Sequence, residues 1–423
     1  MILLKNVRHI DWRTFEITAG NLLVNEGIDE KIQFINTEEI AQLPIDCQQI
    51  DCQGKFAIKS LVNAHHHAYS ALAPGMPPPI DEPNDFLEIL QNIWWKLDQG
   101  LTAEMVEISA AVTAISSAKN GVSFIIDHHS SPNFISGSLK NMAKQFDHIG
   151  LNHLLCYEVS DRDGIESCEK GLNETDSYLR DYQGLVGLHA AFTLSDETLQ
   201  KAEKLAREHL SGIHIHVAED KYDQQYNLRK YGKRVVNRLA DHGLLDFNKT
   251  ILAHCLHIDS QERKLISNST AWVVQNPESN LNNKVGFFNS DSIENKSMIG
   301  TDGMHSNMLR SAQSAYFSGL EKDNTSIPKT YSRLRNAHNY LYSNNFKGDG
   351  ENNLMLLDYN SPTPLSQSNF LGHFFYAFEN SQINSLIVNG KLVMQDKIIL
   401  NIDERLVMQE ARSLAEYLWK KMR

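Results

Sequence analysis

The stretch SLVNAHHHAYSALAPGM, residues 60–76, places three consecutive histidines directly after a short apolar run. The run indicates a buried β-strand that leads into the histidines. Residues two apart on a strand face the same way, so His65 and His67 point to one side and His66 to the other. Two imidazoles in this arrangement can bind one metal ion, and the middle ring should pack or cap. A hydrated His-rich loop is the alternative, so the interpretation depends on the rest of the chain.

Seven further apolar runs of strand length follow along the chain, with helical stretches between most of them. This alternation is typical of a parallel sheet. Eight strands over about 245 residues have the number and length that close a (β/α)₈ TIM barrel. An open doubly wound sheet is the alternative, but no Gly-x-Gly-x-x-Gly follows any run. The runs span residues 60–65, 122–127, 151–158, 184–189, 212–219, 250–255, 271–276 and 298–302.

Polar side chains that can bind metal or move protons follow nearly every one of these runs. Barrel active sites form at the carboxyl ends of the strands, from several strands at once. Histidine placed so regularly after apolar runs therefore favours a metal site over solvated loops. These side chains are His65 and His67, Asp127 with His128 and His129, Glu158, His189, His216 with Glu219, His254 with His257, Asn276 and Asp302.

The two ends of the chain have a different pattern from the middle. Short strands separated by turns dominate the first sixty residues and the region 373–401, where Asn389-Gly390 indicates a hairpin turn. The stretch 331–350 carries little helical pattern, whereas the last twenty residues are amphipathic at helical spacing. We predict a small β-sandwich domain from residues 1–56 plus 352–402, a barrel from residues 57–351 and a C-terminal helix from residues 403–423.

Composition limits the classes of partner. The net charge of −12 disfavours nucleic acid and anionic membranes. The five cysteines are scattered and form no Cys-x-x-Cys pair, which is typical of a reducing compartment. Only four apolar residues precede Lys5, too few for a signal peptide, and no apolar run is long enough to span a bilayer. We expect a cytoplasmic protein that acts on a small molecule, with a homodimer or higher homo-oligomer expected from base rates alone.

Four motifs carry a resemblance to a known family. The strings NAHHH, HIHVAED, LAHC and IGTDG occur in this order. They resemble the amidohydrolase superfamily, in particular its aminohydrolase branch of cytosine, guanine and related deaminases. The longer strings WWKLDQGL, FIIDHHSSP, HIHVAEDKYD, SNLNNKVG and DYNSPTPL are similar to those of the SsnA-type aminohydrolases. The resemblance covers nearly the whole chain, and it implies a barrel with a split β domain.

The resemblance also implies a ligand set and catalytic roles. It assigns one divalent ion per chain, with zinc favoured and iron as the alternative, because imidazole and carboxylate ligands suit both. It makes Glu219 a proton carrier, Asp302 the acceptor of the water's proton, His254 a partner of the developing oxyanion and His189 a substrate contact. The four implied ligands are His65, His67, His216 and Asp302.

Some assignments stay open at this level. His214 faces the same way as His216, but only His216 has an acid three residues on, so His216 is favoured. His257 is expected to be a local hydrogen-bonding residue. Trp94 and its neighbour Trp95 have the helical spacing of core residues, although an aromatic wall for a flat substrate, with Trp94 as a contact, is the alternative.

The two histidines after the second strand are equally ambiguous. Structural capping and substrate contact are both open for His128 and His129, and we include His128 among the candidate substrate contacts. Asp127 is expected to be structural.

The predicted reaction is hydrolytic deamination of an amino-substituted purine, pterin or pyrimidine by a metal-activated water. The same site could instead hydrolyse a cyclic amide or amidine, or displace chloride from a triazine. A catalytically inactive assembly protein is a further alternative, but its signature would be loss of the ligands, and all of them are present. The variable loops around the pocket leave the substrate itself undetermined.

Overall fold

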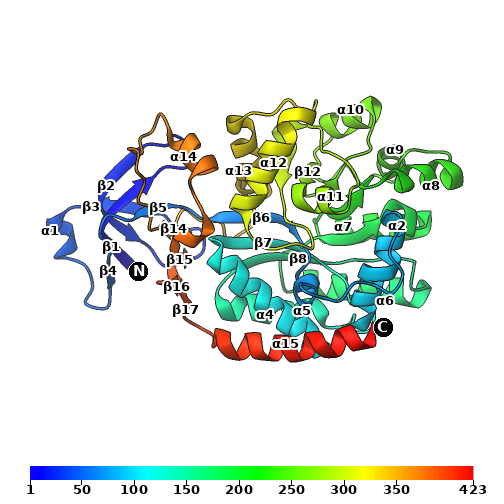
Figure 1. Ribbon diagram of the computed structural model, residues 1–423, viewed down its shortest axis with the longest axis horizontal. Helices are drawn as coiled ribbons and strands as arrows, with labels where there is room; N and C mark the ends of the chain where they lie inside the picture. The colour runs from blue at the N-terminus through cyan, green and yellow to red at the C-terminus, as the bar shows by residue number, and fades with distance from the viewer. Residues whose placement is uncertain (423) are drawn as a thin grey trace.

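The computed structural model describes residues 1–422 and confirms the predicted α/β barrel (Figure 1). Its strands form a three-stranded and a five-stranded parallel sheet, and parallel bridges His66–Asp302 and Val159–Leu188 join the two arcs. The strands are β6 (Leu61–His66), β7 (Val122–His129), β8 (Asn152–Tyr157), β9 (Val186–Ala190), β10 (Ile213–Val217), β11 (Ile251–His254), β12 (Trp272–Gln275) and β13 (Ser297–Ile299).

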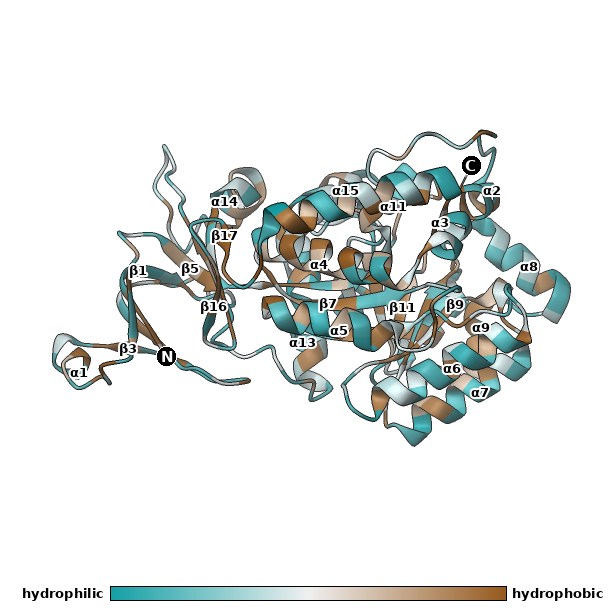
Figure 2. Cartoon of the chain, turned by 90° about the horizontal axis from the view of Figure 1, so that it is seen from below, coloured by the Kyte–Doolittle hydropathy of each residue, from teal (hydrophilic) through white to brown (hydrophobic). Residues whose placement is uncertain are grey.

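Helices surround the barrel and cover the outer side of its strands, and side chains of the strands fill the inner side. Every residue of β7 and β10 is buried, as expected of strands in a covered parallel sheet. In Figure 2 the outer helices α6 and α7 show both polar and apolar residues along their length, because only one face of each packs on the barrel. The surrounding helices include α4 (Ala103–Lys119), α5 (Ser138–Ile149), α6 (Ile165–Leu179), α7 (Asp196–Glu208), α8 (Lys221–Tyr231), α9 (Val235–Asp241), α10 (Ser260–Asn268) and α12 (Met308–Lys322).

The two ends of the chain meet in a second unit beside the barrel, where blue and orange strands lie side by side in Figure 1. All of its strands belong to one nine-stranded sheet, in which β5 pairs antiparallel with β14 and so joins the N-terminal to the C-terminal segment. The strands are β1 (Ile2–Ile10), β2 (Ile17–Val24), β3 (Ile32–Ile35), β4 (Gln48–Asp51), β5 (Phe56–Lys59), β14 (Leu354–Leu357), β15 (Ile383–Val388), β16 (Lys391–Gln395) and β17 (Ile398–Ile399).

The expected hairpin lies between β15 and β16. Asn389 and Gly390 both have positive φ, 50° and 72°, which the two-residue turn requires. A side chain at Gly390 would also collide with the carbonyl oxygen of Asn25, 2.0 Å from an ideal Cβ. This glycine therefore permits both the turn and the close approach of the N-terminal segment.

Two helices complete the packing. The expectation that residues 331–350 lack helical structure is wrong, because α13 (Ile327–Ser343) covers most of that stretch. Burial of Tyr340 and Leu341 against the barrel stabilises α13. This tertiary contribution cannot be read from the weak local pattern. A C-terminal helix, α15 (Glu404–Lys421), lies along α4 and buries Leu418. Within the described residues, no helix combines the length and apolarity needed to cross a bilayer.

Candidate functional site

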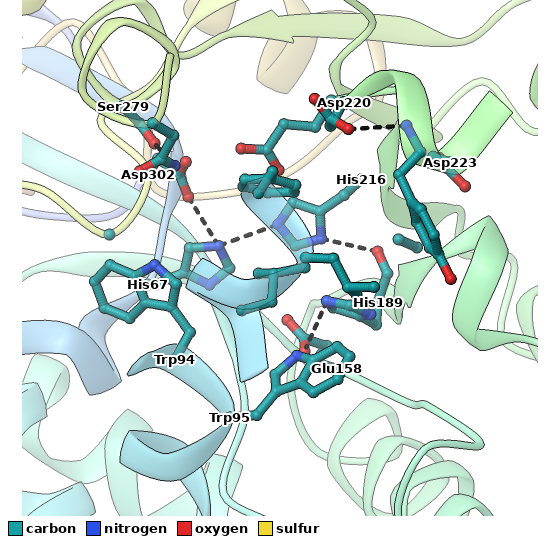
Figure 3. Close-up of a pocket in the computed structure, with 18 of the residues that line it drawn as sticks. His67, Trp94, Trp95, Glu158, His189, His216, Asp220, Asp223, Ser279 and Asp302 are labelled. Carbon is teal, nitrogen blue, oxygen red and sulfur yellow. Dashed lines mark hydrogen bonds and ion pairs between the residues drawn. The ribbon is translucent and has the colours of Figure 1, made fainter. Parts of the chain in front are cut away.

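Four side chains converge at the carboxyl ends of β6, β10 and β13. His65, His67, His216 and Asp302 each offer a ligand atom, and these atoms lie within 4.8 Å of one another. The Nε2 atom of His67 is 3.0 Å from Asp302 Oδ1 and 3.1 Å from His216 Nε2. The Nε2 atom of His65 is 3.5 Å from the same carboxylate oxygen. Figure 3 shows His67 between Asp302 and His216 at the bottom of a cavity.

The backbone brings Asp302 against the first strand. Asp302 has φ of 55°, a left-handed conformation that costs energy for a residue with a side chain, and its amide donates to the carbonyl oxygen of His65 at 3.0 Å. Two residues earlier, a Cβ at Gly300 would lie 2.7 Å from the same oxygen and 2.6 Å from Asn276 Oδ1. Glycine at position 300 therefore lets the chain approach β6 closely enough for the carboxylate to reach the histidines.

Each histidine of the cluster is oriented through its other ring nitrogen. The Nδ1 atom of His67 hydrogen-bonds the carbonyl oxygen of His128 at 2.6 Å, and that of His216 bonds the carbonyl oxygen of His189 at 2.8 Å. His65 Nδ1 is 2.8 Å from His214 Nε2. All three Nε2 atoms are thereby directed at one point, the pattern of metal-binding histidines. His214 supports a ligand instead of joining the cluster, so the choice of His216 over His214 agrees with the geometry.

Buried polar atoms of the cluster fit a divalent cation. His65 Nε2 is buried and makes no hydrogen bond within the described residues, which would be costly without a ligand. Burial lowers the pKa of His65 to about 3 and holds that of His216 well below its usual value, so both rings are neutral, the metal-binding form. Burial also opposes protonation of His67, but Asp302 outweighs it and raises the pKa of His67 to about 9. A cation would displace that proton, because metal ligands must be deprotonated.

An acid and a further histidine adjoin the cluster. His254 Nε2 lies 3.4 Å from Glu219 Oε2 and 3.7 Å from Asp302 Oδ2. Burial, and then the charge of Asp302, raise the pKa of Glu219 well above its usual value, which favours the protonated carboxyl. His254 Nδ1 is 2.8 Å from Asn280 Oδ1. That oxygen can only accept, so Nδ1 carries the proton and Nε2 presents a lone pair to Glu219 and Asp302.

A cavity of about 890 Å³ opens in front of these groups. Its walls include Trp94 and Trp95, which end the helical turn η2 (Leu90–Trp94) and begin α3 (Trp95–Gly100). Both tryptophans line the cavity, as the aromatic-wall alternative expects, and Trp94 also packs against the hydrophobic core. The two tryptophans do lie on a helical segment, as their spacing predicts. That segment borders the cavity, so the face that carries the tryptophans contacts the cavity.

The other predicted contacts have separate positions. His189 lines the cavity. His128 is not among the described residues that line it, since it is fully buried with Nε2 3.1 Å from the carbonyl oxygens of Leu188 and His214. His129 bonds Ser131 Oγ at 2.8 Å, and His257 bonds the carbonyl oxygen of Val285 at 2.6 Å, as local structural contacts.

Two charged residues of the cavity wall, Glu158 and Arg162, are absent from the predicted substrate contacts, although Glu158 is among the polar side chains that follow the strands. Glu158 directly follows β8, and this position at a strand end was the available signal. Arg162 lies beyond the strand in the following loop, where no motif marks it.

Comparisons with known proteins agree with this geometry. The chain is 27% identical over 440 residues to the 5'-deoxyadenosine deaminase of Methanocaldococcus jannaschii, covering 99% of this chain and 100% of that protein. It is 26% identical over 441 residues to the 5-methylthioadenosine/S-adenosylhomocysteine deaminase of Caldanaerobacter subterraneus subsp. tengcongensis, covering 99% and 98%. The crystal structure of a Xanthomonas campestris adenosine deaminase with bound zinc superposes with a TM-score of 0.83 at 17% identity, covering 99% of this chain and 98% of that one. Residues 57–331, which hold all eight barrel strands and the cluster, match the Amidohydrolase family, and the chain belongs to that family.

Proposed function

We propose that this protein is a metal-dependent aminohydrolase that removes an amino group from a heterocycle of the adenosine type. The observation that carries the proposal is the position of Glu219 and His254 beside the four-ligand cluster at the bottom of the cavity. The names of the relatives, which are deaminases of 5'-deoxyadenosine and related nucleosides, support the same reaction class. The overall reaction consumes one water, replaces the amino group by an oxygen and releases ammonia.

His65, His67, His216 and Asp302 would hold one divalent ion, zinc in our proposal and iron as the alternative. Such an ion lowers the pKa of bound water to about 7, which makes a nucleophile available at neutral pH. The carboxylate of Asp302 has separate tasks for its two oxygens. Oδ1 faces the histidines of the cluster, and Oδ2 faces His254 and is placed to accept a proton.

Glu219 supplies the proton that the ring needs. Its raised pKa favours the protonated form, which can donate to a ring nitrogen, and the resulting carboxylate can then carry a proton from the water to the departing amine. His254 presents Nε2 between Glu219 and Asp302, where it can accept a proton and, once protonated, stabilise the developing oxygen charge. The proton thus moves between side chains that lie within 4 Å of one another.

Metal analysis combined with an ammonia assay tests the proposal. Protein purified without added ions should contain about one divalent ion per chain and release ammonia from at least one adenine nucleoside in a panel that also holds pterins and pyrimidines. Glu219→Gln should keep the ion and lose activity by about 10²- to 10⁴-fold, because it removes proton transfer alone. Absence of the ion would contradict the proposal. So would chloride or a ring-opened acid in place of ammonia.

Two further predictions accompany this function. We propose that the protein acts in the cytoplasm on a small heterocyclic substrate. We also propose that it assembles as a homodimer or a higher homo-oligomer, which analytical ultracentrifugation would measure directly.

A further inference from the structure

We propose that the cavity accepts substrates whose outer substituent is neutral or positively charged and rejects those that carry a phosphate there. The inference rests on the proposed function, since it names the substrate class of the same site. Its starting point is that Arg162 is the one lysine or arginine among the described residues that line the cavity. An anionic substituent would need a free cation, and the contacts of Arg162 show that it is not free.

Two carboxylates hold the guanidinium of Arg162. Its Nη2 contacts Asp98 Oδ2 and lies 3.2 Å from Ser130 Oγ, and its Nε is 2.9 Å from Asp163 Oδ2. The Arg162 side chain is only 8% exposed and that of Asp98 only 2%. An anion here would meet a guanidinium whose charge two carboxylates already balance, and drawing Nη2 away from Asp98 would leave a buried carboxylate unpaired.

Outside the proposed metal cluster, the described wall residues include further acids and no second lysine or arginine. Glu158 lines the cavity on the same side, with Oε1 3.9 Å from His189 Nε2 and Oε2 3.2 Å from His128 Nδ1. Asp220 lines it at the start of α8, and so does Asp223, although burial raises the pKa of Asp223 to about 7 and so weakens its negative charge near neutral pH. An anionic substituent would therefore face carboxylates without a compensating cation, and like charges brought together cost several kcal/mol.

A series of neighbouring side chains leads from the cluster to Arg162. From the cluster, the His216 ring lies 5.7 Å from the His189 ring, which lies 6.1 Å from the Trp95 ring. The guanidinium carbon of Arg162 is 5.2 Å from the centre of the Trp95 ring. With the reacting carbon at the cluster, a heterocycle would lie along His189 and Trp95, and its substituent would point towards Arg162. Glu158 lies nearer the cluster, because its carboxylate is within 4.8 Å of ligand atoms of His67 and His216. The cavity should therefore distinguish nucleosides from nucleotides.

Three ligands with the same adenine and different 5' groups test the inference. Binding of 5'-deoxyadenosine, 5'-amino-5'-deoxyadenosine and adenosine 5'-monophosphate is measured by calorimetry on metal-loaded Glu219→Gln protein, so that no turnover intervenes. We expect the first two to bind within about threefold of each other and the monophosphate at least about tenfold more weakly, a difference of 1.4 kcal/mol or more. Equal binding of the monophosphate would overturn the inference, as would failure of all three to bind.

Two variants locate the cause of the selection. Asp98→Asn frees the guanidinium and should strengthen monophosphate binding about tenfold while changing 5'-deoxyadenosine binding by less than about threefold. Asp163→Asn, whose side chain is 20% exposed, provides the same test if the buried substitution disturbs folding. If monophosphate binding is not strengthened in either folded variant, pairing of Arg162 with Asp98 and Asp163 is not the cause of the selection. Ammonia release by the wild-type protein is measured in a separate assay. If the protein shows the binding preference but releases no ammonia, the proposed function is contradicted and the charge selection is still supported.

Discussion

His65 Nδ1 lies 2.8 Å from His214 Nε2, so one buried imidazole of the barrel orients another that points at the proposed metal. The far nitrogen of His214 faces Cys156 Sγ at 3.7 Å, a weak partner. The other two ligand histidines instead use carbonyl oxygens. His214 therefore takes the place that a carbonyl oxygen has for the other two ligands, and it orients His65 without adding a charge.

Removing His214 should weaken metal binding without removing a ligand. We expect His214→Leu to lower the affinity for zinc about 10- to 100-fold, as for other residues that orient metal-binding histidines, measured by competition with a chelator of known affinity. The matched control is His153→Leu, because His153 is also a buried barrel histidine but bonds Tyr178 and Asp147 away from the cluster. Equal zinc affinities in the two variants would show that His214 does not support His65.

Asn280 should act as a positioning residue for His254. Asn280→Leu removes the oxygen that fixes the proton on Nδ1, so we expect kcat to fall about tenfold or more while KM and zinc content stay close to those of the wild type. Asn280→Asp keeps an acceptor and should retain more activity. Its carboxylate favours the protonated imidazole, so the pH at which His254 loses its proton should move upward. A pH profile of kcat that is the same in all three proteins would exclude this role.

Trp95 should contribute to substrate binding more than to the chemical step. It lines the cavity and its ring lies 6.1 Å from that of His189. We expect Trp95→Ala to raise KM roughly tenfold with a smaller effect on kcat, as for loss of contacts made equally in the ground and transition states. The control is Trp272→Phe, which replaces an indole that packs on Tyr340 outside the cavity. A fall in kcat at unchanged KM would contradict the assignment.

A buried ion pair should make the joint between the two units sensitive to acid. Asp349 contacts Lys59 of β5 at 2.8 Å and His338 of α13 at 2.7 Å. Burial by itself would raise the pKa of Asp349, but His338 and Lys59 outweigh it and lower the pKa to about 2. Because the folded pKa is lower than the unfolded one, the stabilisation is present above the ordinary value near 3.8 and is lost as pH falls towards 2.

We expect Asp349→Asn to destabilise the fold by about 3–5 kcal/mol near neutral pH, since it leaves a buried cation unpaired. The difference from the wild type should shrink as pH falls from about 4 to about 2, because the wild-type carboxyl is then protonated. Urea unfolding of both proteins across this range measures the difference directly. A difference that stays constant with pH would show that the pair carries no charge-dependent stability.

Much of the site could be predicted from local pattern. His65 and His67 follow an apolar run two residues apart, and a strand must direct such residues to one side. The order of strands and helices then places the ends of β6, β10 and β13 at one rim, which gathers His216 and Asp302 with them. Alternation and period therefore determined the barrel and the candidate ligands, because both depend on short-range geometry.

Only the tertiary structure decided which neighbours surround those ligands. The local patterns of Trp95 and His128 fit either a buried position or a position on the cavity wall. Long-range packing places Trp95 on the cavity wall and buries His128 in the interior. The pairing of Arg162 with Asp98, 64 positions apart, follows no period of a helix or strand. Contacts of this kind form where separate segments meet in space, so the charge of the cavity wall depends on the closed barrel and not on any stretch of the chain alone.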